Sequence, residues 1–316
     1  MKKSSKAILY ASMAVLCWST VATAFKVGLK TLTYFELILI ASCTALIIFS
    51  VVLSIQNKWA IIRSFNKKKW LYFAGTGLLN PVAYYLILFK SYSLLPAQVA
   101  QPINYSWPIL LLVLLAIFTR RPIPVSKYLG LVLSLLGVLY ISLGASSSDV
   151  SGVSVFGVFL DILSALLWAF YWMINNKHQE VDSIASLFMG FLFGTIYLLI
   201  VSLFVGVHIV SATSLFAGIY VGFFEIGLPF IFFGIAIRTT NNPTLVNQLC
   251  YLAPFLSLFF ISIILGEKIY LSTYIGLMMI VGGILFNQYL ADKISRKIFR
   301  AIVHYRITHR VKSQHS

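Results

Sequence analysis

Charged residues are scarce in this sequence of 316 amino acids, and acidic residues are the scarcest of them, with 8 Asp and Glu against 24 Lys and Arg. Charged residues make up 10% of the chain, whereas hydrophobic residues make up 60%. A soluble domain is about 25% charged and about 45–50% apolar. The shortage of charge therefore excludes an ordinary soluble protein and predicts a single body embedded in a membrane.

Cysteines and catalytic motifs are scarce as well. Cys17, Cys43 and Cys250 each stand inside an apolar run, with no paired spacing and no histidine cluster nearby. They therefore predict neither a disulfide framework nor a zinc site. The sequence also lacks an H-E-x-x-H motif, a G-x-S-x-G motif, a pair of intramembrane carboxylates and a nucleotide-binding P-loop. We therefore expect no enzyme activity, no cofactor, no metal site and no direct use of ATP.

What the sequence does contain is long hydrophobic runs. A bilayer core about 30 Å thick requires around 20 apolar residues per helix. Ten segments fit this length and predict ten transmembrane helices, at residues 7–27, 34–55, 70–90, 96–118, 127–145, 154–175, 184–206, 213–237, 244–265 and 271–291. The run from Ala7 to Phe25 exceeds the roughly 7–15 residues of a signal-peptide core, so we expect it to be retained. The alternation typical of a membrane β-barrel is absent, and the predicted fold class is an all-α, multi-pass membrane protein.

The excess of positive charge, +16 in total, lies mainly in the short loops and in the C-terminal tail. If the N-terminus is cytoplasmic, all Lys and Arg residues except Lys26, Lys30, Lys90 and Lys268 fall on the cytoplasmic side. The positive-inside rule therefore predicts cytoplasmic N- and C-termini in a bacterial-type inner membrane, and we expect no nucleic-acid partner. The basic tail, residues 292–316, is either an amphipathic helix bound to anionic membrane lipids or a solvated disordered segment.

The two halves of the sequence match each other at an offset of about 146–150 residues. The matched pairs are Trp18 with Trp168, Pro81 with Pro229, Lys90 with Arg238, Pro96 with Pro243, Tyr105 with Tyr251, Pro108 with Pro254, Tyr128 with Tyr274, Gly130 with Gly276 and Gly137 with Gly283. Each half contains five predicted helices, and because five is odd the second half must cross the membrane in the opposite sense. We predict a first repeat at residues 1–145 and an inverted second repeat at 146–291. Such repeats are typical of secondary transporters, and gene duplication without transport is the alternative.

Short motifs follow one another along the predicted helices. They are Val15-Leu16-Cys17-Trp18-Ser19-Thr20, Ile103-Asn104-Tyr105-Ser106-Trp107-Pro108, Leu167-Trp168-Ala169-Phe170-Tyr171 with Asn176-Lys177, Cys250-Tyr251-Leu252-Ala253-Pro254, and Gly266-Glu267. In order and spacing they resemble the drug/metabolite transporter superfamily in its EamA-type, ten-helix form, and they look most like its aromatic amino-acid exporter branch. The first half departs from the pattern, because Arg120-Arg121 stands opposite Gly266-Glu267. The resemblance implies efflux of amino acids or related small metabolites and drugs by alternating access.

Polar side chains at membrane depth mark the candidate substrate site. Gln101, Asn104 and Tyr105 are spaced i, i+3 and i+4, so they share one helix face. The ninth predicted helix repeats the theme with Asn247, Gln248 and Tyr251. Polar groups at this depth are costly unless they are paired or face water. We predict that the two faces meet across the midplane as a substrate cavity, and hydrogen bonding between packed helices is the alternative.

Aromatic and acidic residues complete the candidate site. Trp18 and Trp168 lie near the middle of their spans, where their rings would suit a flat substrate or a cationic amine, and core packing is the alternative. Glu225, halfway along its helix, would bind a coupling proton or a substrate amine. Asp161 is a further functional candidate, and Glu36 is expected to cap a helix. The predicted substrate-binding set is Trp18, Tyr84, Gln101, Asn104, Tyr105, Trp107, Trp168, Trp172, Glu225, Gln248 and Tyr251.

These features together predict a secondary transporter of the inner membrane. Its substrate would be a small molecule such as an amino acid, an amine or a drug-like metabolite, and its energy would come from a solute gradient or from protons. Import or exchange of another metabolite is an alternative within the same superfamily. A lipid flippase or a membrane scaffold is an alternative of a different class.

Overall fold

The structure is a computed structural model that describes residues 3–120, 125–146, 153–175, 180–208, 211–239, 246 and 249–290. All regular elements within these residues are helices, which confirms the predicted all-α fold class. Eight helical stretches are long and apolar enough to cross a membrane, and two shorter apolar helices follow them. The protein is therefore a multi-pass membrane protein, while the count of ten crossings stays a prediction.

The helices lie close to the predicted spans. In the first half they are α1 (Lys3–Gly28), α2 (Tyr34–Ile55), α3 (Trp59–Arg63), α4 (Lys67–Gly77), the π-helix η1 (Leu78–Ala83), α5 (Tyr84–Leu94), α6 (Ala97–Asn104), α7 (Trp107–Thr119) and α8 (Val125–Ser146). In the second half they are α9 (Val155–Asn175), α10 (Ser183–Val205), α11 (Ala212–Val221), the π-helix η2 (Gly222–Gly227), α12 (Leu228–Thr239), α14 (Leu252–Leu265), α15 (Leu271–Leu285) and the π-helix η3 (Phe286–Leu290). The basic tail and the first residues of the predicted ninth span lie outside the described residues.

Two predicted spans of the first half are interrupted where the prediction had single helices. Between α4 and α5, Asn80 has extended backbone angles (φ −141°, ψ 117°) and Pro81 follows it. Proline lacks the N–H group that a helix interior requires. The next span ends α6 at Asn104 and begins α7 at Trp107, with Pro108 in its first turn. Inside a membrane, irregular backbone of this kind is tolerated where protein surrounds it or where it lines a cavity.

The second half is interrupted at related places. Between α11 and α12 the chain forms the π-helix η2, which carries Glu225, and Pro229 follows in the first turn of α12. Helix α14 begins only after Tyr251, the residue that matches the break at Tyr105 in the first half. The interruptions therefore recur in both halves, next to matched prolines and tyrosines.

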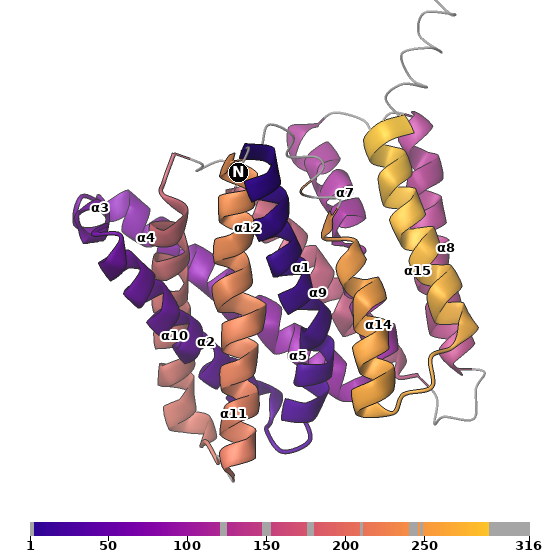
Figure 1. Cartoon of the computed structure of the whole chain (residues 1–316), viewed down its shortest axis with the longest axis horizontal. Helices are drawn as coiled ribbons and strands as arrows, with labels where there is room; N and C mark the ends of the chain where they lie inside the picture. Colours follow the sequence, from indigo (N-terminus) through magenta and orange to yellow (C-terminus); the bar gives the residue numbers. More distant parts are fainter. Residues whose placement is uncertain are drawn as a thin grey trace, which may run out of the picture.

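Helices α8 and α15 form a close antiparallel pair at one edge of the bundle (Figure 1). A side chain on Gly137 would clash with the carbonyl of Gly276, and a side chain on Gly276 would clash with the carbonyl of Gly137. Gly130 and Gly283 block each other in the same way. Between these two contacts, Ser134 donates a hydrogen bond to the carbonyl of Ile280 at 3.0 Å. Small residues thus allow the two backbones to approach closely, as membrane helix pairs often require.

This contact is self-complementary. Gly130 matches Gly276 in the sequence and Gly137 matches Gly283, yet each glycine touches the partner of the other. An exchange of this kind is what a two-fold relation between two similar surfaces produces.

The remaining contacts between the halves also join helices of the first half to helices of the second. Helix α1 packs against α12 and α14, and α9 packs against α5 and α7, while α2 packs against α10. Helices of the two halves are therefore interleaved. The start of α1 and the end of η3 lie on the same side of the bundle, at the top of Figure 1. That this side is cytoplasmic stays a prediction.

Candidate functional site

An aromatic cluster lies where α5, α9 and α12 meet. The Trp168 ring stacks on Tyr84 with centroids 4.8 Å apart and an interplanar angle of 29°. Tyr171, Phe230 and Trp172 lie 5.7, 5.8 and 6.0 Å from the Trp168 ring. Trp168 remains half-buried although it stands near the middle of its helix.

Two more predicted tryptophans extend this cluster. Trp107 lies 6.4 Å from Trp172 in a stacked arrangement. Trp18 of α1 lies 6.4 Å from Phe230 and 5.6 Å from Phe233. Since Phe230 touches both Trp18 and Trp168, the two matched tryptophans of the repeats are joined through one ring.

Glu225 lies beside the aromatic cluster rather than within a row of charges. Its carboxylate accepts a hydrogen bond from the Tyr85 hydroxyl at 3.2 Å. The Trp18 indole N–H donates to its backbone carbonyl at 3.1 Å, and the Tyr85 ring lies 4.6 Å from that of Tyr84. A π-helical turn such as η2 shifts the direction of its side chains and is frequent at functional sites. The buried carboxylate is therefore aimed into the site by a local irregularity of the backbone.

A chain of hydrogen bonds leads away from the stacked rings. The Tyr84 hydroxyl donates to Asn104 Oδ1 at 3.4 Å, and Asn104 Nδ2 donates to Ser164 Oγ at 2.9 Å. Ser164 in turn donates to the carbonyl of Asp161 at 2.7 Å. Both polar atoms of the Asn104 amide are therefore hydrogen-bonded. At this residue the structure agrees with the alternative of hydrogen bonding between packed helices.

Gln101 and Trp172 differ from Asn104, because each has a buried polar atom without a hydrogen-bond partner in the described part of the chain. These atoms are Gln101 Oε1 and Trp172 Nε1. Nearly all buried polar atoms of native proteins find a partner in protein or ordered water. Trp172 belongs to the aromatic cluster, and Gln101 lies one turn before Asn104 on α6. A free donor and a free acceptor at these positions suit a ligand that carries both an N–H group and an oxygen.

The second polar face is described only in part. Tyr251 is buried at the start of α14, and Gln248 lies outside the described residues. Tyr105 is half-buried at the end of α6 and packs against the core. Helices α6 and α14 touch, but the predicted meeting of the two polar faces stays a prediction.

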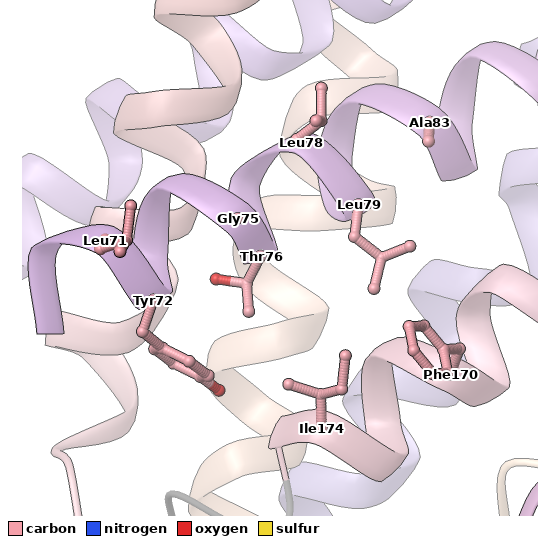
Figure 2. Close-up of a pocket in the computed structure, with 9 residues that line it drawn as sticks. All are labelled: Leu71, Tyr72, Gly75, Thr76, Leu78, Leu79, Ala83, Phe170 and Ile174. Carbon is pink, nitrogen blue, oxygen red and sulfur yellow. The ribbon is translucent and has the colours of Figure 1, made fainter. Parts of the chain in front are cut away.

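A cavity of about 530 Å³ lies elsewhere, between α4, η1 and α9. Figure 2 shows Tyr72, Thr76 and Leu79 turned towards Phe170 and Ile174 across this space. The remaining lining residues are Leu71, Gly75, Leu78 and Ala83. None of the predicted site residues lines the cavity, and its wall is almost wholly apolar. We therefore place the candidate site at the aromatic cluster, not at this lateral cavity.

Charged groups gather at the two ends of the bundle. At the end where α1 begins, Asp182 caps α10 and binds Lys58 at 2.7 Å, with Arg238 at 3.9 Å. Burial alone would raise the pKa of Asp182, but the hydrogen bonds from Lys58 and from the α10 backbone lower it below its usual value.

At the opposite end, Glu267 accepts hydrogen bonds from the backbone N–H groups of Ala97 and Gln98 at 3.0 and 3.2 Å. This carboxylate from the second half therefore caps α6 of the first half. Glu36 forms a capping box with Thr33, as the sequence suggested. The charges outside the site thus act mainly on helix ends.

Sequence reasoning missed three residues that complete the site, namely Tyr85, Ser164 and Phe230. Tyr85 adjoins a predicted residue, and Ser164 lies one turn before Trp168 on the same helix face. Phe230 follows Pro229, which the repeat had already singled out. Proximity to predicted residues was the signal available for each of them.

Comparisons with known proteins give a consistent result. The EamA-like transporter family matches the chain twice, over residues 5–143 and 155–289. The uncharacterized transporter YvbV of Bacillus subtilis (strain 168) is 27% identical over 222 residues, which cover 69% of this chain and 72% of that protein. A solved crystal structure with 20% sequence identity covers 92% of this chain and 99% of its own, with a TM-score of 0.65. At that level of identity, the last likeness concerns the fold alone.

Proposed function

The chain belongs to the EamA-like transporter family and is a membrane transporter, and we propose that it exports amino acids or related small metabolites by alternating access. In this proposal the inner membrane is its location, and residues 1–145 and 146–291 form two inverted repeats. The basic tail contacts anionic lipids on the cytoplasmic side. Family membership supports a transport function. The class of substrate and the direction of transport are part of the proposal.

The proposed substrate class is inferred from the side chains of the aromatic cluster. Stacked rings of Trp168 and Tyr84 offer flat apolar faces, on which an aromatic ring stacks or an ammonium group binds. The Glu225 carboxylate offers a partner for an amine or a proton, and Gln101 Oε1 offers a free acceptor. A zwitterionic molecule with an apolar or aromatic side chain matches this combination.

Alternating access is supported by the self-complementary seam between α8 and α15 and by the interrupted helices. Secondary transporters commonly bind substrates at discontinuous helices near the midplane, and one repeat moves against the other around that site. Here the break at Asn80 lies one turn before Tyr84, the break at Tyr105 follows Asn104, which accepts a hydrogen bond from Tyr84, and η2 carries Glu225. Movement at these breaks would change access to the cluster without unfolding the long helices.

Counterflow in proteoliposomes tests the proposal. Metabolite profiles of overexpressing and deletion strains first identify candidate solutes, and purified protein then exchanges labelled for unlabelled solute across the vesicle membrane. We expect Trp168→Ala to weaken solute binding by about two- to tenfold, because a lost aromatic pair corresponds to about 0.5–1.5 kcal/mol. Trp70→Ala, at an exposed ring that touches Phe193 away from the site, serves as the matched control.

The alternatives give different results in the same vesicles. An importer or exchanger would catalyse counterflow with a different preferred direction in cells. A lipid flippase or scaffold would show no counterflow of any amino acid or amine, and this outcome would remove the proposed function.

A further inference from the structure

Asp161 is a fully buried acid that the substrate site does not use. It lies on α9, which packs against α5, α6, α7 and η1. Its Oδ1 atom is 2.9 Å from Ser91 Oγ of α5. Its Oδ2 atom is buried and has no hydrogen-bond partner within the described residues. A carboxylate in this position is expected to be functional by default, since a charge at membrane depth is costly without a partner.

Within the described residues, the elements packed around Asp161 carry few titratable groups. Helices α6 and α7 and the π-helix η1 contain no titratable side chain. Helix α5 carries the hydroxyls of Tyr84, Tyr85 and Tyr92 and one cation, Lys90, whose ammonium group lies over the Tyr34 ring, 5.0 Å from its centroid. Lys26 of α1 donates to the carbonyls of Tyr92 and Leu95, both at 3.0 Å. The ion pairs of the described chain do not include Asp161.

The hydrogen bonds between Ser91, Leu88 and Asp161 can be arranged in two ways. Ser91 Oγ lies 2.8 Å from the carbonyl of Leu88 and 2.9 Å from Asp161 Oδ1. A hydroxyl carries one proton and can donate to only one of these acceptors. If Ser91 donates to Leu88, Asp161 must be protonated and donate to Ser91. If Asp161 is ionised, Ser91 must turn its proton towards Asp161. Rotation of the Ser91 hydroxyl therefore accommodates both the protonated and the ionised form of the Asp161 carboxyl group.

We propose that the Asp161 carboxyl group is the binding site for a coupling proton, separate from the substrate site at Trp168. This inference rests on the proposed transport function. The proton adds to one carboxylate oxygen on binding and returns to water on release, so no other reactant is required. Protonation removes the uncompensated charge between α5 and α9 and favours their contact, and loss of the proton favours a state in which water reaches Asp161.

The site is joined to the substrate cluster by geometry. Asp161, Ser164 and Trp168 are spaced i, i+3 and i+7, so they share one face of α9. Ser164 binds the Asp161 carbonyl and accepts from Asn104, which accepts from Tyr84, the ring stacked on Trp168. A proton shifts the equilibrium between two conformations only if it binds them unequally. A closed α5–α9 interface excludes water from Asp161 and an open interface admits it, so the two forms bind the proton with unequal affinity.

The test compares gradient-driven accumulation with counterflow in the same proteoliposomes. We expect Asp161→Asn to keep counterflow, because asparagine resembles the neutral acid, and to lose accumulation driven by a pH gradient. Infrared difference spectra of the full chain at high and low pH should show a protonated-carboxyl band in the wild type, and the contribution of one buried carboxyl group to this band should be lost in the variant. Asp182→Asn, an acid outside the membrane spans, is the control and should keep both accumulation and the band.

The possible outcomes distinguish failure of the transport function from failure of the proton site. Absence of counterflow in the wild type removes the transport function itself. Counterflow without pH-driven accumulation in the wild type, or full accumulation by Asp161→Asn, overturns the proton site and leaves transport intact. Loss of counterflow in Asp161→Asn also overturns it, because Asp161 would then serve the substrate or the packing.

Ser91→Ala provides an independent check if Asp161→Asn does not fold. It keeps the carboxyl group and removes its one hydrogen-bond partner. We expect the pH at half-maximal accumulation to shift while counterflow persists, and an unchanged pH profile overturns the proposal.

Discussion

The seam between α8 and α15 allows one prediction to be worked out from the structure. In Gly137→Ala, the new Cβ atom would lie 2.6 Å from the carbonyl oxygen of Gly276 and 3.0 Å from Cγ1 of Ile280. Ordinary van der Waals contact begins at 3.4 Å, so the helices must separate by about 0.8 Å. Overpacking of this kind typically costs about 1–3 kcal/mol. We expect Gly137→Ala to lower the free energy of unfolding by that amount.

The matched control lies on the same helix pair. In Gly282→Ala, the new methyl group would meet only Leu133 Cδ2, at 3.9 Å. Alanine is the better helix former by roughly 0.5–1 kcal/mol, so this variant should be as stable as the wild type or more stable. Thermal unfolding in one detergent at one scan rate compares the two, because irreversible unfolding makes Tm depend on the rate of heating. Equal Tm values for the two variants would refute the close approach of the helices.

Two further predictions concern acids. Because the pKa of Asp182 is lowered in the folded protein, its pair with Lys58 stabilises the fold above the ordinary value of 3.8, and this contribution is lost as the pH falls through the folded pKa. Asp182→Asn should therefore flatten the acid limb of a plot of Tm against pH, and an unchanged limb would contradict the assignment. Glu225→Gln should abolish coupled flux in proteoliposomes, because it removes the carboxylate proposed to pair with the substrate amine. Unchanged flux and unchanged pH dependence in that variant would remove Glu225 from the mechanism.

The helical framework could be predicted from the sequence because it depends on local properties. Hydrophobic runs of sufficient length satisfy their own backbone hydrogen bonds in lipid, so run length alone places most helices. The prolines at 81 and 108 mark places where helices are interrupted, and Pro229 follows the π-helical turn at Glu225, but the residues of that turn carry no signal of their own. Its position depends on packing against α2 and α12.

The candidate site could be predicted only in outline. Mid-depth Trp, Tyr and Glu residues identified the participants, and the structure brings Trp18, Tyr84, Trp168 and Glu225 into one region. The partners within it come from segments far apart in the chain, and spacing in one sequence carries no information about such contacts. The glycines of the seam were visible as matched pairs, while their exchange across α8 and α15 required three dimensions.

The cap that Glu267 places on α6 has an energetic consequence for the two faces of the carrier. Halves of identical chemistry would give the inward-open and outward-open forms equal free energies. Here one end has a carboxylate on two backbone N–H groups, whereas the sequence has Arg121, a cation without acceptor capacity, at the matching position. A hydrogen bond to a charged group contributes about 1.5–3 kcal/mol. If the two repeats alternate as proposed and the cap breaks when this end opens, we expect the cap to favour closure of its own end by roughly ten- to hundredfold, and so to set the form in which the empty carrier rests.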